Sequence, residues 1–361
     1  MSLSANDLSE LMELWAELNL TAAENVSGFE TLRCSGGVGR LALLHVLSVL
    51  YIFIFLVGLV ANGLVVWVHL RSERMRDETH RYAAHLAAAD LCVVATLPVW
   101  VASLLQGGRW PFGDAACKLT HLVFSANLFG SIFFLTCMSV DRYLSVTLLA
   151  DGRRKKAARR LICVAVWALA LAASVPDTYF LRVVKSSHHD GAVCRPVYPP
   201  ASPRVWMAAV QLSFFLLGFA VPFPVITASY LLLAAAVPPD AGRRLVLSYI
   251  LVFLACWLPF HGVLLLDSLT LLGVLPFGCR LDDFLDAALH LTQAVSLLHC
   301  CINPVLYNFL SRNYRHDLMK AVLRSSSRTS WLLDASDTES SAGDDRVPLE
   351  DVRVPMEDTL F

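Results

Sequence analysis

The sequence predicts an all-α membrane protein, a bundle of seven transmembrane helices followed by a short amphipathic eighth helix. Its composition is one basis for this: of 361 residues, 56% are hydrophobic and only 16% are charged, whereas a soluble domain carries about a quarter charged residues. The other basis is seven long, almost uncharged segments, each long enough or nearly so to cross the roughly 30 Å hydrocarbon core of a bilayer as a helix. These segments are 41–70, 82–108, 119–140, 161–176, 205–236, 245–266 and 287–311, which together form a bundle over 41–311.

The distribution of Lys and Arg predicts the orientation of this bundle. The connections that follow the first, third, fifth and seventh segments carry sixteen of these residues, and the three opposite loops carry seven. Because loops rich in Lys and Arg stay in the cytoplasm, the N-terminus is expected outside the cell and the C-terminus inside. No cleavable signal peptide is evident before residue 41, so the first span is expected to act as a signal-anchor.

The segments outside the bundle have distinct compositions. Residues 1–40 form an acidic tail, either flexible or folding as an amphipathic helix on a basic partner, with glycosylation sequons at Asn19 and Asn25. Residues 312–323 place apolar side chains at helical spacing, which predicts a helix lying on the membrane lipid. Residues 324–361 are expected to be disordered and to be phosphorylated by receptor kinases, each phosphate adding about −1.5 to −2 charges. The candidate sites are Ser325, Ser326, Ser327, Thr329, Ser330, Ser336, Thr338, Ser340 and Ser341.

Four of the ten cysteines lie on the predicted outer side: Cys34, Cys117, Cys194 and Cys279. An even number of thiols in an oxidising compartment predicts two disulfides. Four cysteines allow three pairings, and spacing alone leaves all three open. The other six cysteines fall inside spans and are expected to be packing residues.

Asp90 is the only charged residue within the predicted spans. A carboxylate near mid-membrane costs about 2.5–3.5 kcal/mol on insertion scales, so Asp90 is expected to face the bundle interior, with Asn62, Ser131 and Asn303 as candidate neighbours. It is either part of a structural polar cluster or a Na⁺ site that biases two helix arrangements. With so little charge in the spans, a transporter or channel is disfavoured.

Signatures of catalysis and metal binding are missing from the sequence. There is no nucleophile–base set and no phosphate-binding glycine loop. The adjacent His188 and His189 have no third ligand at metal spacing. The sequence therefore predicts neither an enzyme nor a zinc protein, and it predicts no nucleic-acid partner.

Motifs in all seven spans, in order, resemble the rhodopsin-like G-protein-coupled receptors. They are Asn62, Asp90, Asp141-Arg142-Tyr143, Trp167, Pro222, Cys256-Trp257-Leu258-Pro259 and Asn303-Pro304-Val305-Leu306-Tyr307. Thr96-Leu97-Pro98, Trp110-Pro111-Phe112-Gly113 and the extra outer cysteine pair resemble the chemokine-receptor branch. The continuation Leu144-Ser145-Val146-Thr147 resembles its atypical members, since signalling members usually read Leu-Ala-Ile-Val there. The short loop Pro238-Pro239-Asp240-Ala241-Gly242 also fits an atypical member, because its prolines would end the fifth helix early.

This resemblance implies a plasma-membrane receptor that binds a CXC chemokine of the stromal-cell-derived type, recruits arrestin and cycles through endosomes with little or no G-protein signalling. It implies no cofactor, and homo- or hetero-oligomers with other chemokine receptors are a further expectation. The implied disulfides are Cys117–Cys194 and Cys34–Cys279. The implied ligand contacts are Asp177, Asp267, Gln293, Trp100, His121 and Gln211. The implied transducer and switch residues are Asp141, Arg142, Tyr143, Trp257, Tyr230, Asn303 and Tyr307.

Two departures from the family pattern leave alternatives open. Gln211 stands where a carboxylate is expected, and residues 1–40 contain no Tyr that could be sulfated. A conventional G-protein-signalling chemokine receptor and a receptor for a non-chemokine basic peptide therefore remain alternatives.

Overall fold

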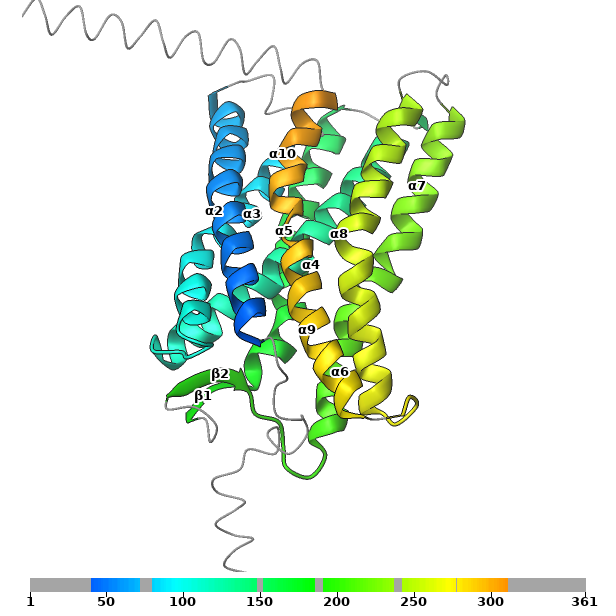
Figure 1. Cartoon of the computed structure of the whole chain (residues 1–361). Coiled ribbons are helices and arrows are strands. Elements are labelled where there is room, and N and C mark those ends of the chain that lie inside the picture. Colours follow the sequence, from blue (N-terminus) through cyan, green and yellow to red (C-terminus); the bar gives the residue numbers. More distant parts are fainter. Residues whose placement is uncertain are drawn as a thin grey trace, which may run out of the picture.

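The computed structural model describes residues 40–71, 80–147, 152–185, 191–236, 242–276 and 278–310. The expectations for the two tails, the amphipathic helix 312–323 and the short loop before Gly242 lie outside these residues. The helices are α2 (Arg40–Arg71), α3 (His80–Leu105), α4 (Gly113–Thr147), α5 (Gly152–Tyr179), α6 (Pro203–Phe215), α7 (Pro222–Ala236), α8 (Gly242–Leu271), α9 (Cys279–Ser296) and α10 (His299–Leu310). They form a bundle of roughly parallel and antiparallel rods (Figure 1).

Within the described residues, seven helical segments are long and apolar enough to cross a membrane, which confirms the predicted fold class. Two of these segments are composite: α6 and α7 form the fifth span, and α9 and α10 form the seventh. Several helices extend beyond the uncharged stretches. The seventh span begins at Cys279 instead of 287, with Asp282 in its first turn, because acidic side chains stabilise the positive end of a helix dipole.

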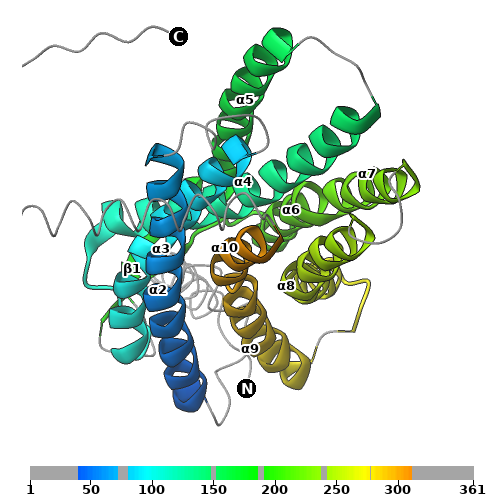
Figure 2. The ribbon, with the colours of Figure 1, turned by 90° about the horizontal axis from the view of Figure 1, so that it is seen from above.

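The third span, α4, is the central helix of the bundle. In the most apolar 18-residue stretch of α4, 72% of the residues are buried inside the protein. The corresponding fraction in the other spans is 22–39%. Viewed from above, α4 crosses the bundle obliquely (Figure 2). Phe129 and Ile132 of α4 lie in the main hydrophobic core, whereas Leu56 of α2 and Val164 of α5 are exposed. The outer helices therefore present apolar side chains to the lipid, as membrane helices do.

The fifth span is interrupted by a π-helical turn, η2 (Leu216–Ala220). Its wide turn is closed by the bond from the Val221 N–H to the Leu216 carbonyl, 3.0 Å, directly before Pro222. A Cβ at Gly218 would lie 2.6 Å from Cε1 of His261, so only glycine permits this close approach of α8.

The seventh span is interrupted at Leu297 and Leu298, between α9 and α10. Around the break, the amide groups of Leu298, Cys300 and Cys301 donate to carbonyls three residues earlier at 2.9–3.0 Å. Such tighter bonding is typical of short 3₁₀ segments. The sequence predicted one continuous helix here and in the fifth span.

A two-stranded antiparallel hairpin covers one end of the bundle, and this end is called the hairpin end below; the opposite one is the far end. The strands are β1 (Leu181–Lys185) and β2 (Ala192–Pro196), with Val183 paired to Cys194. The hairpin lies at the lower end in Figure 1. It was not predicted from the sequence.

Candidate functional site

The segment Trp110–Gly113 and a disulfide fasten the hairpin to the start of α4. The buried Trp110 donates its backbone N–H to the Ala192 carbonyl at 2.7 Å and its Nε1–H to the Gly113 carbonyl at 3.0 Å. Gly113 has a φ of +80°, a conformation that favours glycine. The expected disulfide Cys117–Cys194 is present. The Trp-Pro-Phe-Gly motif therefore has a structural role here.

Asp114 and a further disulfide-bonded cysteine, Cys279, also lie at the hairpin end. Asp114 accepts a hydrogen bond from the backbone N–H of Val183 at 3.0 Å and pairs with Lys118 at 2.9 Å. Cys279 is also disulfide-bonded, while Cys34, its expected partner, lies outside the described residues. The hairpin is thus held to α4 by a covalent bond and by polar contacts.

Three of the expected ligand residues form a first cluster, on α3, α4 and α5. The Ser125 hydroxyl donates to Oδ2 of Asp177 at 2.8 Å, and His121 interacts electrostatically with the same carboxylate. Trp100 packs edge-on against His121, with ring centroids 4.7 Å apart. The structure brings Asp177, His121 and Trp100 together.

Tyr198 belongs beside this cluster and was missed in the sequence. Its ring packs on Phe180 with centroids 5.0 Å apart. Burial and, second, the nearby Asp177 carboxylate raise the pKa of Tyr198, which keeps the phenol neutral and able to donate a hydrogen bond. Tyr198 lies in the connection after β2, and no sequence pattern marked it.

A second cluster joins α6 to α8. Nε2 of Gln211 donates to Oδ2 of Asp267 at 2.6 Å, and the Ser268 hydroxyl donates to Oε1 of Gln211 at 2.9 Å. Asp267 was expected to face the outer mouth, but its side chain is only 3% exposed. A carboxylate at 211 would repel Asp267, whereas the amide donates to it. Gln293, partly exposed on α9, makes no side-chain hydrogen bond to either cluster within the described part of the chain.

The polar core is built around Asp90, which is fully buried on α3. Its Oδ1 accepts from Asn127 Nδ2 at 2.9 Å and from the Ser131 hydroxyl at 3.3 Å, and it lies 3.3 Å from Nε2 of His299. Ser131 was expected. Asn127 and His299 were not, although Asn127 could have been found because residues four apart share a helix face.

The other two expected neighbours of Asp90 do not hydrogen-bond it among the described residues. Nδ2 of Asn62 donates to the carbonyls of Gly58 at 2.9 Å and Cys300 at 2.7 Å, which joins α2 to α10. Asn303 is buried and lines a small cavity. The two carbonyls hold the Asn62 amide away from Asp90, whereas Nδ2 of Asn303 has no hydrogen-bond partner among the described residues.

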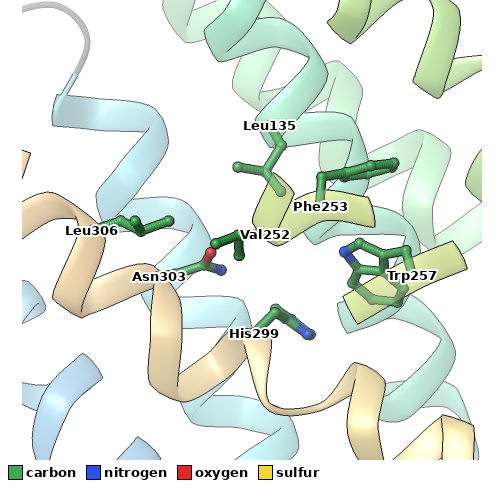
Figure 3. A pocket seen from close by; sticks show the side chains of 7 residues that line it. All are labelled: Leu135, Val252, Phe253, Trp257, His299, Asn303 and Leu306. Carbon is green, nitrogen blue, oxygen red and sulfur yellow. The ribbon is translucent and has the colours of Figure 1, made fainter. Parts of the chain in front are cut away.

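This cavity separates the polar core from the far end. Leu135, Val252, Phe253, Trp257, His299, Asn303 and Leu306 line it (Figure 3). Trp257 packs on His299 with ring centroids 4.8 Å apart. The expected switch residue Trp257 is therefore in contact with a residue that touches Asp90.

An ion pair links α4 to α5 at the far end. Nε and Nη2 of Arg159 donate to the two carboxylate oxygens of Asp141 at 2.9 and 3.0 Å. The side chains of Arg159 and Asp141 are 3% and 18% exposed. Nη2 of Arg159 also donates to the Ser145 hydroxyl at 3.4 Å, and that hydroxyl donates to the Asp141 carbonyl at 2.7 Å. Arg159 was missed because it lies in a run of basic residues typical of a solvated cytoplasmic loop.

The remaining switch candidates have separate positions. Arg142 and Tyr143 are partly buried beside Asp141, and Tyr230 is buried on α7. The side chain of Tyr307, on α10, lies outside the described residues.

Seven apolar helices around a polar core, with acidic clusters at one end and a buried ion pair at the other, define a seven-helix membrane receptor. The chain belongs to the rhodopsin family of seven-transmembrane receptors, whose family model matches residues 61–307. It is similar to chemokine receptors of that family. It is 50% identical to Atypical chemokine receptor 3 of Canis lupus familiaris and 49% identical to that of Homo sapiens, in both cases over 327 residues, 87% of this chain and 90% of the relative.

A more distant relative is C-X-C chemokine receptor type 4 of Xenopus tropicalis, 34% identical over 283 residues, which are 76% of this chain and 78% of the relative. Family and fold together make the chain a multi-pass plasma-membrane protein. It is a receptor without a cofactor and not an enzyme.

Proposed function

We propose that the chain is an atypical chemokine receptor. It binds a CXC chemokine of the stromal-cell-derived type at the hairpin end, recruits arrestin at the far end and internalises the ligand with little or no G-protein signalling. Similarity to proteins named Atypical chemokine receptor 3 over 87% of the chain supports this proposal. The structural observation that carries it is the pair of carboxylates, Asp177 and Asp267, held at the hairpin end.

The hydrogen-bond partners of these carboxylates suit a basic ligand. Asp177 accepts from Ser125 and Asp267 accepts from Gln211. A neutral donor orients a carboxylate without cancelling its charge, and carboxylates recognise Lys and Arg by charge-assisted hydrogen bonds. Chemokines are basic, so these clusters are the proposed contacts for the ligand, with Trp100, His121 and Gln293 beside them.

The far end supports the transducer part of the proposal. Arg159 holds Asp141 and contacts Ser145, a residue that is Ala in the usual signalling pattern. Ser145 therefore adds a hydrogen-bond acceptor to a clamp between α4 and α5, next to Arg142. We propose that this clamp fixes the far end in a form that accepts arrestin better than a G protein.

The segments outside the described residues complete the proposal. The N-terminus is extracellular, with Asn19 and Asn25 glycosylated and Cys34 bonded to Cys279. The C-terminus is cytoplasmic, receptor kinases phosphorylate its Ser and Thr residues, and the phosphates attract arrestin. The receptor cycles through endosomes and forms oligomers with other chemokine receptors.

Binding of labelled CXC chemokines to cells that express the full chain tests the ligand. The double variant Asp177→Asn, Asp267→Asn is expected to weaken binding at least severalfold. Asp283→Asn is the matched control, because it removes an acidic charge from the start of α9 without changing either cluster. Equal affinity of the double variant and the wild type, at equal surface expression, would show that these carboxylates do not bind the ligand.

Signalling assays test the transducer. Ligand is expected to recruit arrestin and to leave cyclic AMP unchanged. A strong inhibitory-G-protein response in cells without arrestins would contradict the proposal and favour a conventional chemokine receptor. Specific uptake of a non-chemokine basic peptide, with no chemokine binding, would favour a peptide receptor instead.

A further inference from the structure

We propose that Asp90, His299 and Cys300 form a binding site for a transition-metal cation, with Zn²⁺ as the best-fitting ion, in the core of the bundle. This site is independent of the proposed ligand and transducer. It replaces the Na⁺ site considered from the sequence, because two of its three donor atoms are nitrogen and sulfur.

The donor atoms have the spacing of a metal site. Nε2 of His299 lies 3.3 Å from Oδ1 of Asp90 and 3.6 Å from Sγ of Cys300. One donor atom from each of the three residues lies within 4.8 Å of the other two. Zinc–ligand bonds of about 2.0–2.3 Å at tetrahedral angles place neighbouring ligand atoms roughly 3.3–3.8 Å apart. A zinc ion therefore fits between these donors with small adjustments.

His299 and Cys300, which are consecutive in the sequence, lie next to the break in the seventh span. Here the amide of Cys300 donates to the Leu297 carbonyl at 3.0 Å, three residues back. His299 and Cys300, at the first positions of α10, both approach the carboxylate of α3 (Figure 3 shows His299 at this bend).

The hydrogen bonds of His299 fix its tautomer. Nδ1 lies 2.6 Å from the Ser296 carbonyl, which can only accept, so Nδ1 carries a proton. Metal-binding histidines commonly donate their other ring nitrogen to such an oxygen. When neutral, Nε2 points a lone pair at the Asp90 carboxylate, and two electron-rich atoms at 3.3 Å need a proton or a metal cation between them.

The Asp90 carboxylate is held in place by hydrogen bonds and still has an oxygen that could bind a cation. Asn127 and Ser131 donate to Oδ1 of Asp90. Oδ2 is buried and has no hydrogen-bond partner among the described residues, which is costly for a carboxylate oxygen in a membrane interior. A cation that contacts this oxygen would remove that cost.

The charges and donor types select the ion. Zn²⁺ bound to one carboxylate, one thiolate and one neutral imidazole makes an electrically neutral site, and binding releases the Cys300 thiol proton to solvent. Imidazole and thiolate favour zinc-like ions, whereas hard cations prefer oxygen donors. The cavity beside His299 offers about 10 Å³ to the centre of a water molecule, roughly enough for one water as a fourth ligand.

Cobalt absorption tests the site directly. The full chain, purified in lipid nanodiscs with its exposed Cys92 changed to Ser, is treated with chelator and titrated with Co²⁺. We expect near-ultraviolet thiolate-to-cobalt absorption at one equivalent, which Zn²⁺ then abolishes. Cys300→Ser should remove the absorption. Cys301→Ser should retain it, because that buried neighbour donates to the Ile54 carbonyl and lies outside the cluster.

Thermal unfolding gives a second measurement. Zn²⁺ should raise the Tm of the wild type by several degrees. It should raise the Tm of three variants much less: Asp90→Asn, His299→Asn and Cys300→Ser. Na⁺ and Mg²⁺ should not raise the Tm of the wild type. Absence of both the absorption and the Tm shift in the wild type would overturn the proposal, leaving a proton between Asp90 and His299. An identical response of wild type and Cys300→Ser would overturn it as well, because the metal would then bind elsewhere.

Discussion

The two ends of the bundle use the same residue type for opposite purposes. At the hairpin end, neutral donors from Ser125 and Gln211 hold Asp177 and Asp267. At the far end, a guanidinium holds both oxygens of Asp141. A neutral donor orients a carboxylate without supplying a counter-charge, whereas an arginine neutralises it and fixes two helices together. The partner, more than the carboxylate itself, determines whether an acidic residue is a binding group or a structural one.

Breaking the far-end pair should have the largest effect on stability. Arg159→Met leaves Asp141 without its bidentate partner, and because Asp141 is 18% exposed the cost should lie near the lower end of the about 3–5 kcal/mol of a fully buried pair. Thermal unfolding of the purified receptor measures this. Arg160→Met, at an exposed neighbouring position, is the control and should cost little. Adding Asp141→Asn to Arg159→Met should recover part of the loss; if it does not, the contribution of Arg159 lies in packing and not in the ion pair.

Removing the disulfide tests the hairpin end. Cys117→Ser together with Cys194→Ser is expected to cost about 2–4 kcal/mol of stability and to abolish chemokine binding, because the hairpin loses its covalent link to α4. The measurements are thermal unfolding and ligand binding. Cys92→Ser, which removes a free and exposed thiol, should change neither. Full binding by the double variant would mean that the polar contacts of Trp110 and Asp114 suffice to hold the hairpin.

The two acidic clusters should differ in their effect on the ligand. Asp177→Asn is expected to weaken chemokine binding about tenfold, which corresponds to roughly 1.4 kcal/mol. Asp267→Asn should weaken it less, because Asp267 is buried against Gln211. Equilibrium binding of labelled chemokine to each single variant gives the order. The reverse order would mean that the ligand displaces Gln211 and reaches Asp267.

The smallest effect is expected for Ser145→Ala. It removes a 3.4 Å bond to Arg159 and should cost about 0.5–1 kcal/mol. The ratio of G-protein to arrestin response should rise slightly if Ser145 biases the far end. Thr147→Ala is the control, because among the described residues the Thr147 hydroxyl bonds within α4, to the Tyr143 carbonyl at 3.0 Å. An equal change in both variants would exclude a specific role for Ser145.

The parts of the fold that depend on local composition could be predicted from the sequence. Seven apolar segments gave seven spans, and the cost of a charge in lipid placed Asp90 inside the bundle. The features that depend on contacts between distant residues were missed. His299 meets Asp90 only after the break in the seventh span, and Arg159 reaches Asp141 only when α5 packs on α4. The hairpin strands are five residues each, too short for an apolar alternation to stand out.

The π turn before Pro222 also changes how this chain is compared with its relatives. A turn closed over five residues takes one residue more than an α-helical turn, and one residue corresponds to about 100° of rotation. The side chains of α7, Tyr230 among them, therefore face directions that a count along an unbroken helix would misassign. A relative with a regular helix at this point must be aligned to α7 with a one-residue gap before its inward-facing positions correspond.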